Sequence, residues 1–511
     1  MSAVRRWSWR WGVVGLACVV AAGGAARGAD QPQWGQRYSR NMVSAETNLP
    51  ERFDPATGRN VKWVARMGSE TYLPPIVSGG KVLIGTNNAN PRDRRHRGDR
   101  GILLCLDEAD GSLCWQLVVP KLTGDPYYDW PRGGITSPPT VEGDRAYLVT
   151  NRGAAVCLDM NGQANGNDGP VRDEGRLMAP KGATPREPTE RDADVIWRFD
   201  THAEVGSYPH DAAHASILLD GRHLYYNTSN GVDNTHRRIR KPDAPSLIVL
   251  DKATGRLVAT DGERIGPMIF HCSWSSPSLG IVGGRKLIFY GGGDGVCYAF
   301  KALAPDAAAG PEGRPARLEK VWSFDCDPDA PKENIHRYVA NRRESPSNIM
   351  GMPVFHNGRV YVAAGGDVWW GKRRAWLKCI DATKAGDVTR SAGIWSAELN
   401  SHCCSTPSIH DGLVYVPDCS GTIHCLDAET GKSYWTHRAE GPIWGSTLVA
   451  DGKVYVGSRR SDFHVFAAGR QKRVLASIKL DSPLSAPPTA ANGTLFLTTM
   501  KKLYAVVKTA K

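Results

Sequence analysis

The chain has 511 residues, among them 55 glycines, 33 prolines and 16 tryptophans, and its formal net charge is +12. Short Val, Ile, Leu and Tyr runs alternate with turn residues and no long stretch has helical periodicity, so the composition excludes a helical bundle and predicts an all-β fold. After residue 30 no segment approaches ~20 uninterrupted apolar residues, which excludes a membrane-spanning helix from the mature chain.

Residues 1–28 have the pattern of a secretory signal peptide. Three arginines precede an apolar run over residues 11–22, and small residues follow up to residue 29. We therefore expect an exported protein, periplasmic or extracellular, with a charge of about +8 once the four arginines of this segment are removed. Cys18 follows a sequence close to the pattern that precedes a lipidated cysteine, so an outer-membrane lipoprotein is the less favoured alternative.

The remaining excess of basic residues is concentrated at residues 92–97 and 236–241. Charged runs of this kind are usually solvated loops, and we interpret both in that way rather than as sites for an acidic polymer. Because export separates the protein from nucleic acid, we expect no nucleic-acid partner.

A pattern of four strands recurs eight times along the chain. Each copy has a first strand marked by proline or a small residue, two strands opened by turns, and a fourth strand that carries tryptophan or leucine. The first-strand signals lie at Pro74, Pro138, Ser216, Pro277, Pro353, Pro407, Ser446 and Pro487. The fourth-strand signals lie at Trp63, Trp115, Trp197, Leu257, Trp322, Trp395, Trp435 and Leu475. Eight such units predict an eight-bladed β-propeller.

The two ends of the chain are offset relative to this repeat. The pattern begins with a fourth strand near Trp63 and ends after a third strand at residues 503–507. The N-terminal and C-terminal strands are therefore predicted to pair in one shared blade, which closes the ring and leaves no open sheet edge. We assign residues 60–511 to the propeller and residues 29–59 to an N-terminal extension.

The spacing of the third strands predicts insertions in the propeller. They fall at about residues 89–100, 161–193, 231–245, 302–317 and 325–348. Residues 161–193 and 325–348 are expected to be surface loops.

The clearest copy of the repeat contains the segment DAETGKSYW at residues 427–435, and weaker copies lie at residues 107–115 and 251–255. This segment resembles the tryptophan docking motif of the PQQ-like β-propeller family, which includes quinoprotein dehydrogenases and BamB-like proteins. Residues 274–277, 291–295, 322–326 and 365–367 resemble a large group of exported bacterial members. The resemblance covers residues 60–507 and implies the fold, but catalytic and non-catalytic propellers share the motif, so it implies no single activity.

Four cysteines occupy one position of the predicted third strand. These are Cys105, Cys157, Cys379 and Cys425, and the other blades hold Val or Ala there. A position filled by Cys, Val or Ala is a small core position, so these cysteines are predicted to pack rather than to bridge. Seven further cysteines of the mature chain leave disulfides possible and their connectivity open.

The adjacent cysteines Cys403 and Cys404 bear on a quinone cofactor. The family resemblance implies a comparison with quinoprotein alcohol dehydrogenases, in which adjacent cysteines form a strained ring beside PQQ. Here the pair precedes the sixth first strand rather than an early one, and the family's calcium ligands, catalytic Asp and tryptophan floor find no match. No cofactor is therefore certain, and PQQ with calcium is a minor alternative.

The segments that join one blade to the next must emerge on one face, at the mouth of the central channel. Polar and aromatic side chains on loops around a funnel are typical of a ligand site. The candidate residues of this funnel are Trp130, Arg132, His210, Asp211, His214, His271, Cys272, Trp274, Asn348, His402, Cys403, Cys404 and Trp444.

The histidines of this set raise the question of a metal. Imidazole and thiolate suit Cu or Zn, but no tight His-x-His or Cys-x-x-Cys cluster is present. We therefore predict no metal site and keep His210, His271 and His402 as weak candidates, contributed by different blades. The alternative is that these side chains only plug the channel and bond to one another.

A complete propeller pattern without a complete catalytic set favours a non-catalytic binding or scaffold protein. We expect a monomer that binds a protein, peptide or glycan partner on its loop-rich face. One alternative is an oxidoreductase that uses PQQ or a metal in the same funnel. The other is a BamB-like outer-membrane protein assembly factor, which predicts lipidation of Cys18. Catalytic residues are not assigned.

Overall fold

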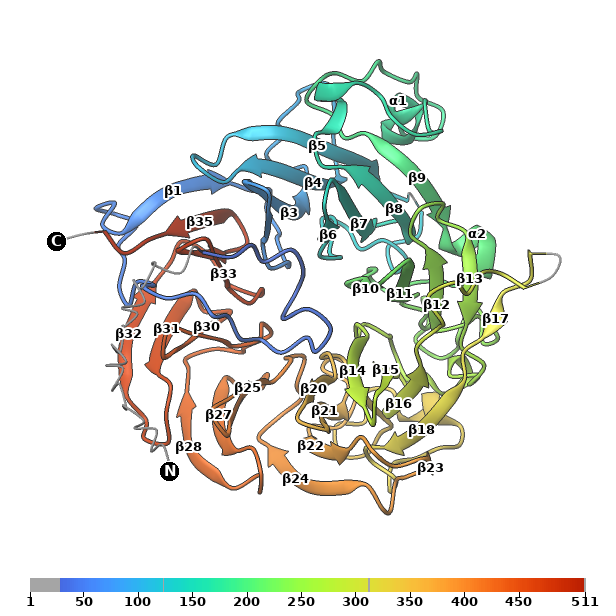
Figure 1. The fold of residues 1–511 in the computed structure, drawn as a ribbon, viewed down its shortest axis with the longest axis vertical. Helices are drawn as coiled ribbons and strands as arrows, with labels where there is room; N and C mark the ends of the chain where they lie inside the picture. Colours follow the sequence, from blue (N-terminus) through green and yellow to red (C-terminus); the bar gives the residue numbers. More distant parts are fainter. Residues whose placement is uncertain (1–27, 123, 311–312, 510–511) are drawn as a thin grey trace, which may run out of the picture.

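The computed structural model describes residues 28–122, 124–310 and 313–509. The predicted signal peptide up to residue 27, and with it Cys18, lies outside the described residues. Figure 1 shows the chain as a ring of small sheets around a central axis, in sequence order from blue to red. Within the described part of the chain, no helix has both the length and the apolar character that a membrane crossing requires.

Eight sheets form the ring, and each is an antiparallel blade that runs from a short inner strand to a long outer strand. Blades 1 to 4 are built from β2 (Ile76–Ser78), β3 (Lys81–Asn87), β4 (Arg100–Asp107), β5 (Leu113–Pro120); β6 (Thr140–Glu142), β7 (Arg145–Val149), β8 (Ala154–Asp159), β9 (Val195–Asp200); β10 (Leu218–Asp220), β11 (His223–Asn227), β12 (Leu247–Asp251), β13 (Leu257–Thr260); and β14 (Ser278–Val282), β15 (Arg285–Gly291), β16 (Val296–Lys301), β18 (Lys320–Asp325).

Blades 5 to 8 follow the same order. Their strands are β19 (Ser347–Asn348) with β20 (Val354–His356), β21 (Arg359–Gly366), β22 (Ala375–Asp381), β24 (Gly393–Leu399); β25 (Ser408–His410), β26 (Leu413–Pro417), β27 (Thr422–Asp427), β28 (Ser433–Arg438); β29 (Leu448–Ala450), β30 (Lys453–Gly457), β31 (Asp462–Ala467), β32 (Val474–Lys479); and β33 (Thr489–Ala491), β34 (Thr494–Thr498), β35 (Lys502–Val506), β1 (Val61–Arg66). The predicted all-β, eight-bladed propeller is confirmed.

The eighth blade closes the ring as predicted. Its outer strand β1 comes from the N-terminal end and pairs antiparallel with β35, with Trp63 opposite Ala505. Figure 1 shows the blue strand β1 beside the dark red β35. The last sheet is therefore held by backbone hydrogen bonds between the two ends of the chain, and the ring has no free edge at its seam.

In six blades a tryptophan of the outer strand ties its blade to the next one. Each indole Nε1 donates a hydrogen bond to a main-chain carbonyl of the following blade. The pairs are Trp63 with Glu108 (3.0 Å), Trp115 with Met160 (2.9 Å), Trp197 with Lys252 (2.9 Å), Trp322 with Ala382 (3.2 Å), Trp395 with Ala428 (3.0 Å) and Trp435 with Gly469 (2.9 Å). The docking motif therefore encodes this contact between neighbouring blades.

The glycine of the motif lies directly against the ring of the preceding blade. Gly431 has a φ of 71°, and a Cβ there would lie 2.6 Å from the Trp395 ring. A side chain at this position would be strained in its backbone conformation and would also collide with the indole. Glycine therefore lets the turn approach the tryptophan closely.

Blades 3 and 7 depart from the predicted pattern. Leu257 and Leu475 were expected at the tryptophan position, but the strand register places Ala259 opposite Val249 and Ala476 opposite Val465. Both leucines lie in the predicted fourth strands, β13 and β32, one or two residues before the position that tryptophan holds in the other blades. A β-bulge lies beside the equivalent position of every blade, so it does not set blades 3 and 7 apart. What these two blades lack is the tryptophan that marks the position in the sequence.

Inserted segments take the place of the two missing tryptophans. Beside blade 3, the short strand β17 (Ala316–Arg317) pairs in parallel with β13, with Ala316 opposite Ala259. Beside blade 7, Leu49 and Phe53 of the N-terminal extension pack in the same buried cluster as Ala476. Alanine leaves room at the outer strand, and neighbouring chain fills it.

Residues 161–193 lie on the surface as expected, since most of them are exposed, but they also contain short helical elements. They contain a 3₁₀ helix (Gly162–Asn165) and the helix α1 (Glu174–Met178), whose Met178 is buried. Asp192 forms a parallel bridge with Gln116, so the insertion covers the outer strand β5 (Figure 1). The other short elements are α2 (Thr201–Val205), 3₁₀ helices at Gly266–Met268 and Ile335–Tyr338, and β23 (Gly386–Asp387).

The N-terminal extension crosses the middle of the ring, where Figure 1 shows it in dark blue. It bonds to the inner strands of blades 2, 4 and 7. Amides of Val141, Leu279 and Val449 donate to carbonyls of Pro32, Tyr38 and Met42, respectively, at 2.7–2.9 Å. The extension therefore lies against the wall of the central channel rather than outside the propeller.

Arg40 anchors the extension at the axis. Its side chain is fully buried and donates to the carbonyls of Pro277 (3.1 Å), Trp34 (3.0 Å) and Ser216 (3.2 Å). Burial lowers the pKa of Arg40 to about 9, which leaves the guanidinium charged at neutral pH. Several hydrogen bonds from one buried cation fix the path of the extension.

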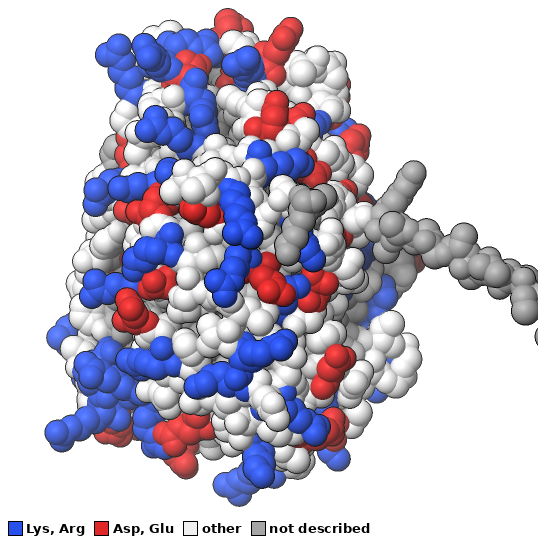
Figure 2. All heavy atoms as spheres, turned by 90° about the vertical axis from the view of Figure 1, so that its left-hand side faces the viewer, with Lys and Arg blue, Asp and Glu red and all other residues white. Residues whose placement is uncertain are grey.

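Charges of both signs are mixed on the side of the ring. Figure 2 shows one such side, where lysine and arginine side chains lie among aspartate and glutamate. On this side the basic residues do not form the continuous stripe that a polyanion would follow.

Replacing Trp435 by Ala is expected to lower the free energy of unfolding by about 3–5 kcal/mol, because it opens a cavity between blades 6 and 7. Trp435→Phe keeps most of the volume and loses the bond to Gly469, so it should cost about 1 kcal/mol. Urea denaturation measures both. The exposed Val474→Ala is the control, and a Trp435→Ala protein as stable as this control would contradict the docking role.

Arg40→Ala is expected to lower the free energy of unfolding by about 3 kcal/mol, because it removes the donors and leaves three buried carbonyls unpaired. The extension should also become sensitive to limited proteolysis. Arg37→Ala is the matched control, since the Arg37 side chain is 62% exposed. Equal protection of the extension in both variants would show that Arg40 does not anchor it.

Candidate functional site

A pocket of about 400 Å³ opens at the centre of the ring. All eight segments that lead into a first strand contribute to its wall, so they converge as the blade order predicted. Their contributions are Leu73, Thr136, His214, Trp274, Met350, Cys404, Trp444 and Ser485. The ring geometry thus brings residues from every blade to one site.

Tryptophan and tyrosine supply eight of the 19 residues that line the pocket. They are Trp34, Tyr72, Tyr127, Trp130, Trp274, Trp369, Trp370 and Trp444. Trp369 packs edge to face against Trp274 at 5.3 Å and against Trp444 at 5.9 Å between ring centroids. Trp34 comes from the N-terminal extension, so the extension supplies part of the pocket as well as closing the channel.

The predicted funnel residues divide into three groups. Those in the wall are Trp130, Asp211, His214, His271, Trp274, Cys404 and Trp444. Those buried behind the wall are His210, Cys272 and Asn348. Arg132, His402 and Cys403 lie away from the pocket.

Two of the last three residues, Arg132 and His402, have partners outside the pocket. The Arg132 side chain is 72% exposed and its Nε lies 3.9 Å from Glu70. His402 Nδ1 bonds to the carbonyl of Gly366 (3.0 Å), and its Nε2 lies 2.9 Å from an Arg342 nitrogen. Neither side chain points into the funnel, although both sit on the predicted connecting segments.

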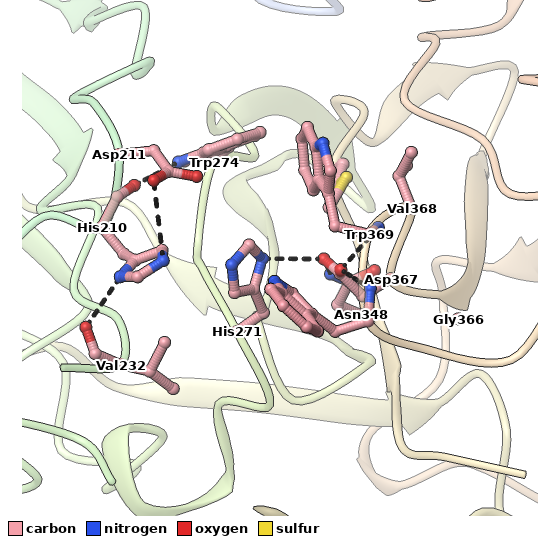
Figure 3. Close-up of polar contacts among 12 residues, drawn as sticks. His210, Asp211, Val232, His271, Trp274, Asn348, Gly366, Asp367, Val368 and Trp369 are labelled. Carbon is pink, nitrogen blue, oxygen red and sulfur yellow. Dashed lines mark hydrogen bonds and ion pairs between the residues drawn. The ribbon is translucent and has the colours of Figure 1, made fainter. Parts of the chain in front are cut away.

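Three histidines meet at one side of the pocket. His210, His236 and His271 each offer a ring nitrogen, and these nitrogens lie within 4.8 Å of one another. The His210 and His271 rings are 4.6 Å apart, and the His236 ring is 4.8 Å from His210. Figure 3 shows His210 and His271 facing each other, with Asp211 above His210.

Each of the two facing histidines has one nitrogen held by a partner. His210 Nδ1 bonds to the carbonyl of Val232 (2.8 Å), and His271 Nδ1 bonds to the carboxylate of Asp367 (3.0 Å). The other nitrogen, Nε2, is buried and has no hydrogen-bond partner in either histidine. One carboxylate oxygen of Asp211, 3.7 Å from His210 Nε2, is also buried without a partner.

Asp367 is the best-supported group of the site. It is fully buried, and one oxygen accepts from the amides of Trp369 and Trp370 at 2.9 Å each. The other oxygen accepts hydrogen bonds from His271 and from the side-chain amide of Asn348 (3.3 Å). This set of donors holds the carboxylate, and through it the His271 ring, in one orientation.

Burial and neighbouring charges shift the pKa values of the cluster. Burial, reinforced by His271, lowers the pKa of His210 to about 2, and burial raises the pKa of Asp211 to about 6. Burial opposes protonation of His271, but Asp367 outweighs it and raises the pKa. Burial opposes ionisation of Asp367, yet His271 holds its pKa below the usual range. His210 is therefore a neutral imidazole, and His271 and Asp367 balance each other.

The backbone at this site is strained. Asp211 has a φ of 66° and His236 a φ of 58°, in the left-handed region that residues other than glycine rarely adopt. The Asp211 amide donates to the carbonyl of Tyr127, and its carbonyl accepts from the amide of Trp130 at 2.8 Å. Such strain persists only where surrounding contacts impose it, and it is common at functional sites.

Sequence reasoning missed His236, Asp367, Trp34 and the pair Trp369-Trp370. His236 belongs to the basic run that we interpreted as a solvated loop, and for this residue that interpretation is wrong because its side chain is only 7% exposed. Asp367 lies in the GGD segment that carried part of the family resemblance, which was the available signal. No local pattern marks Trp34 as part of the pocket.

The cysteines support the predicted core positions and not a ring beside the pocket. All eleven cysteines that the structure describes are free thiols, and those of the repeated third-strand position are buried. Cys403 Sγ points to the carbonyl of Pro417 (3.3 Å) in the core between blades 5 and 6. Cys404 Sγ instead lies 3.5 Å from Met350 Sδ and 3.8 Å from Cys419 Sγ.

A family model described as outer membrane protein assembly factor BamB matches residues 35–170 and 373–473. The chain is a PQQ-like β-propeller. Quinohemoprotein alcohol dehydrogenase ADH IIB of Pseudomonas putida is 24% identical over 132 residues, which are 24% of this chain and 18% of that enzyme. The chain thus aligns with less than a fifth of that relative.

Solved structures agree with this fold. BamB from Moraxella catarrhalis superposes with a TM-score of 0.52 at 14% identity, covering 86% of this chain and 98% of its own. Quinohemoprotein alcohol dehydrogenase from Comamonas testosteroni gives 0.56 at 11% identity, covering 94% and 81%. A europium-containing methanol dehydrogenase gives 0.56 at 13% identity, covering 94% and 89%. At these identities the likeness shows the fold alone.

The pocket of this PQQ-like propeller does not fit the quinone for which the family is named. PQQ carries three carboxylates and is held with calcium. Among the described residues that line the pocket there is no lysine or arginine, and Asp211 is the one carboxylate. Arg459 lies over the Trp444 ring (3.9 Å) and bonds to Ser485, behind the wall, so a trianion would find one cation nearby and no basic side chain in the wall itself, at a desolvation cost.

Oxidation of the folded propeller with diamide is expected to join Cys404 to Cys419, because their sulfurs lie 3.8 Å apart while Cys403 is turned into the core. Peptide mass mapping without reduction identifies the bond. Cys419→Ser should abolish it and Cys403→Ser should not. A bond between Cys403 and Cys404 would contradict the geometry.

Proposed function

We propose that this protein is an exported PQQ-like propeller that binds a small neutral carbohydrate in its aromatic pocket, without a quinone cofactor. One observation carries the proposal: eight aromatic side chains line a pocket of about 400 Å³ whose polar groups are few and nearly balanced in charge. Aromatic faces attract the polarised C–H groups of sugar rings, and the Asp211 carboxylate and neighbouring imidazoles can bond to hydroxyls. The signal-peptide pattern of residues 1–28 supports export.

The charge of the pocket argues against ionic ligands. A polyanion would need lysine or arginine in the wall, and the described wall has none. An organic cation would need free carboxylates, but Asp367 is already paired with His271, which leaves Asp211 as the one carboxylate in the described wall. A neutral ligand with hydroxyl groups avoids both costs.

The size of the pocket separates a glycan from the other expected partners. A stable protein interface buries about 1,200–2,000 Å², mostly on flat or protruding surface, whereas a concave pocket of a few hundred Å³ is typical of small ligands. A protein or peptide partner would have to bind outside the pocket. The mixed charges in Figure 2 are consistent with the absence of a nucleic-acid partner.

Trp444→Ala is expected to weaken carbohydrate binding about 3- to 10-fold, because a stacking aromatic contact contributes about 0.5–1.5 kcal/mol. Isothermal titration with a panel of neutral mono- and disaccharides measures the affinity. Trp376→Ala is the matched control, since both tryptophans are half-buried and carry an arginine over the ring, but only Trp444 lines the pocket.

Two results would overturn the proposal. One is that no saccharide of the panel binds the wild-type protein at millimolar concentration. The other is that Trp376→Ala and Trp444→Ala weaken binding equally, because the bound sugar would then not occupy the pocket.

A further inference from the structure

We propose that His210, His236 and His271 bind a divalent transition-metal ion at the side of the aromatic pocket. Their ligand nitrogens lie within 4.8 Å of one another, and all three residues are buried. The inference goes beyond carbohydrate binding and does not depend on it, because it rests on the unpaired polar atoms of the cluster.

The hydrogen bonds of two histidines determine which nitrogen is available. A carbonyl oxygen can only accept, so His210 Nδ1 must carry the proton that bonds to Val232, and its Nε2 carries the lone pair. In the same way His271 Nδ1 carries a proton and donates a hydrogen bond to the Asp367 carboxylate. Figure 3 shows both Nε2 atoms on the sides of the rings that face each other. A carboxylate or carbonyl behind a histidine is the usual support of a metal ligand.

Burying these two nitrogens without hydrogen-bond partners costs free energy. Neither Nε2 has a hydrogen-bond partner, and an unsatisfied buried acceptor costs about 1–3 kcal/mol. Although the two rings face each other, no hydrogen bond joins the two Nε2 atoms. A cation between them would satisfy both, so the cluster is better explained as a ligand set than as a plug of the channel.

His236 supplies the third nitrogen from a different part of the chain. It belongs to the insertion at residues 231–245, and its ring lies 5.4 Å from that of His271 and 4.7 Å from Trp370. Gly231 lets this insertion approach the site, since a Cβ there would lie 2.5 Å from His210 Cβ. The insertion therefore completes a set that two connecting segments begin.

Asp211 can supply the fourth ligand of the ion through an oxygen, or leave the fourth coordination position open. Its unpaired oxygen is 3.7 Å from His210 Nε2, within reach of an ion held by the histidines. Asp211, His236 and His271 also line the pocket. An ion here would be accessible to a ligand in the pocket, as in metal sites that keep one position for substrate or water.

The donor set selects the class of ion. Imidazole nitrogens with one carboxylate suit zinc, copper and related transition metals, whereas calcium and magnesium take oxygen ligands. The alternative cluster of His271, Cys272 and Asp367 is less suitable. Asp367 is already bonded to four donors, and burial raises the pKa of the Cys272 thiol well above its usual range.

Zinc binding by the full exported chain tests the proposal. Protein stripped with a chelator is titrated with Zn²⁺ against a chromophoric competitor, and bound metal is counted by mass spectrometry. We expect one ion per chain. His236→Ala should weaken binding at least 100-fold, and Asp367→Asn, which removes the support of a ligand, about 10- to 100-fold.

His402→Ala is the matched control, because His402 is a buried funnel-loop histidine whose two nitrogens are already engaged with Gly366 and Arg342. It should bind zinc like the wild type. Absence of stoichiometric zinc in the wild type, or equal losses in His236→Ala and His402→Ala, would overturn the site. If His236→Ala does not fold, the visible spectrum of the Co²⁺-loaded wild type decides between histidine ligation, with intense four-coordinate bands, and adventitious binding without them.

The carbohydrate proposal fails separately from the metal proposal. Trp444→Ala removes a pocket aromatic outside the histidine cluster, so it should leave zinc affinity unchanged while weakening saccharide binding. If the protein binds zinc but no saccharide, the metal site is supported and the carbohydrate proposal is not. Saccharide bound by a chain that takes no zinc would sustain the pocket and overturn the metal site.

Discussion

The indole of an outer strand docked on the next blade is the contact on which the rest of the structure depends. A blade of four short strands cannot bury both faces by itself, and the docked tryptophan both fills the gap to its neighbour and bonds to its backbone. Repeated around the ring, this contact sets the angle between blades. At blades 3 and 7, where alanine replaces the tryptophan, β17 and the segment with Leu49 and Phe53 restore the contact. Closure by β1 and β35 then completes the ring.

The position of the functional site follows from that closure. Once eight inner strands start around one axis, the segments before them must converge, and these segments line the pocket. The N-terminal extension lies at the same axis inside the ring. There the buried Arg40 donates hydrogen bonds to Trp34, Ser216 and Pro277. A buried cation with full hydrogen bonding is stable only in one geometry, so the extension is a fixed part of the pocket.

The histidine cluster gathers several buried polar atoms without partners at one place. Such atoms also occur elsewhere among the described residues, for example at Asp194 and His464, but His210, His271 and Asp211 bring three of them together beside two strained residues. Local violations of packing rules, held in place by their surroundings, are the usual mark of a site selected for binding rather than for stability.

The sequence alone determined the blade number, the position of each third strand and the pairing of the two ends, because strand periodicity, turn glycines and docking tryptophans are local signals. It also identified the connecting segments as the place where side chains converge. It placed Leu257 and Leu475 in the correct fourth strands but not the residues opposite Val249 and Val465, since no tryptophan marks that position in blades 3 and 7.

Only the tertiary structure decided which side chains meet. His271 and Asp367 are 96 positions apart, and no spacing rule joins them. His236 looked like part of a solvated loop, but the fold buries it against the pocket, and the weak metal candidate His402 has both nitrogens engaged with Gly366 and Arg342. The reason is physical: the ring fixes where each loop begins, but the direction of a side chain depends on contacts with loops of other blades.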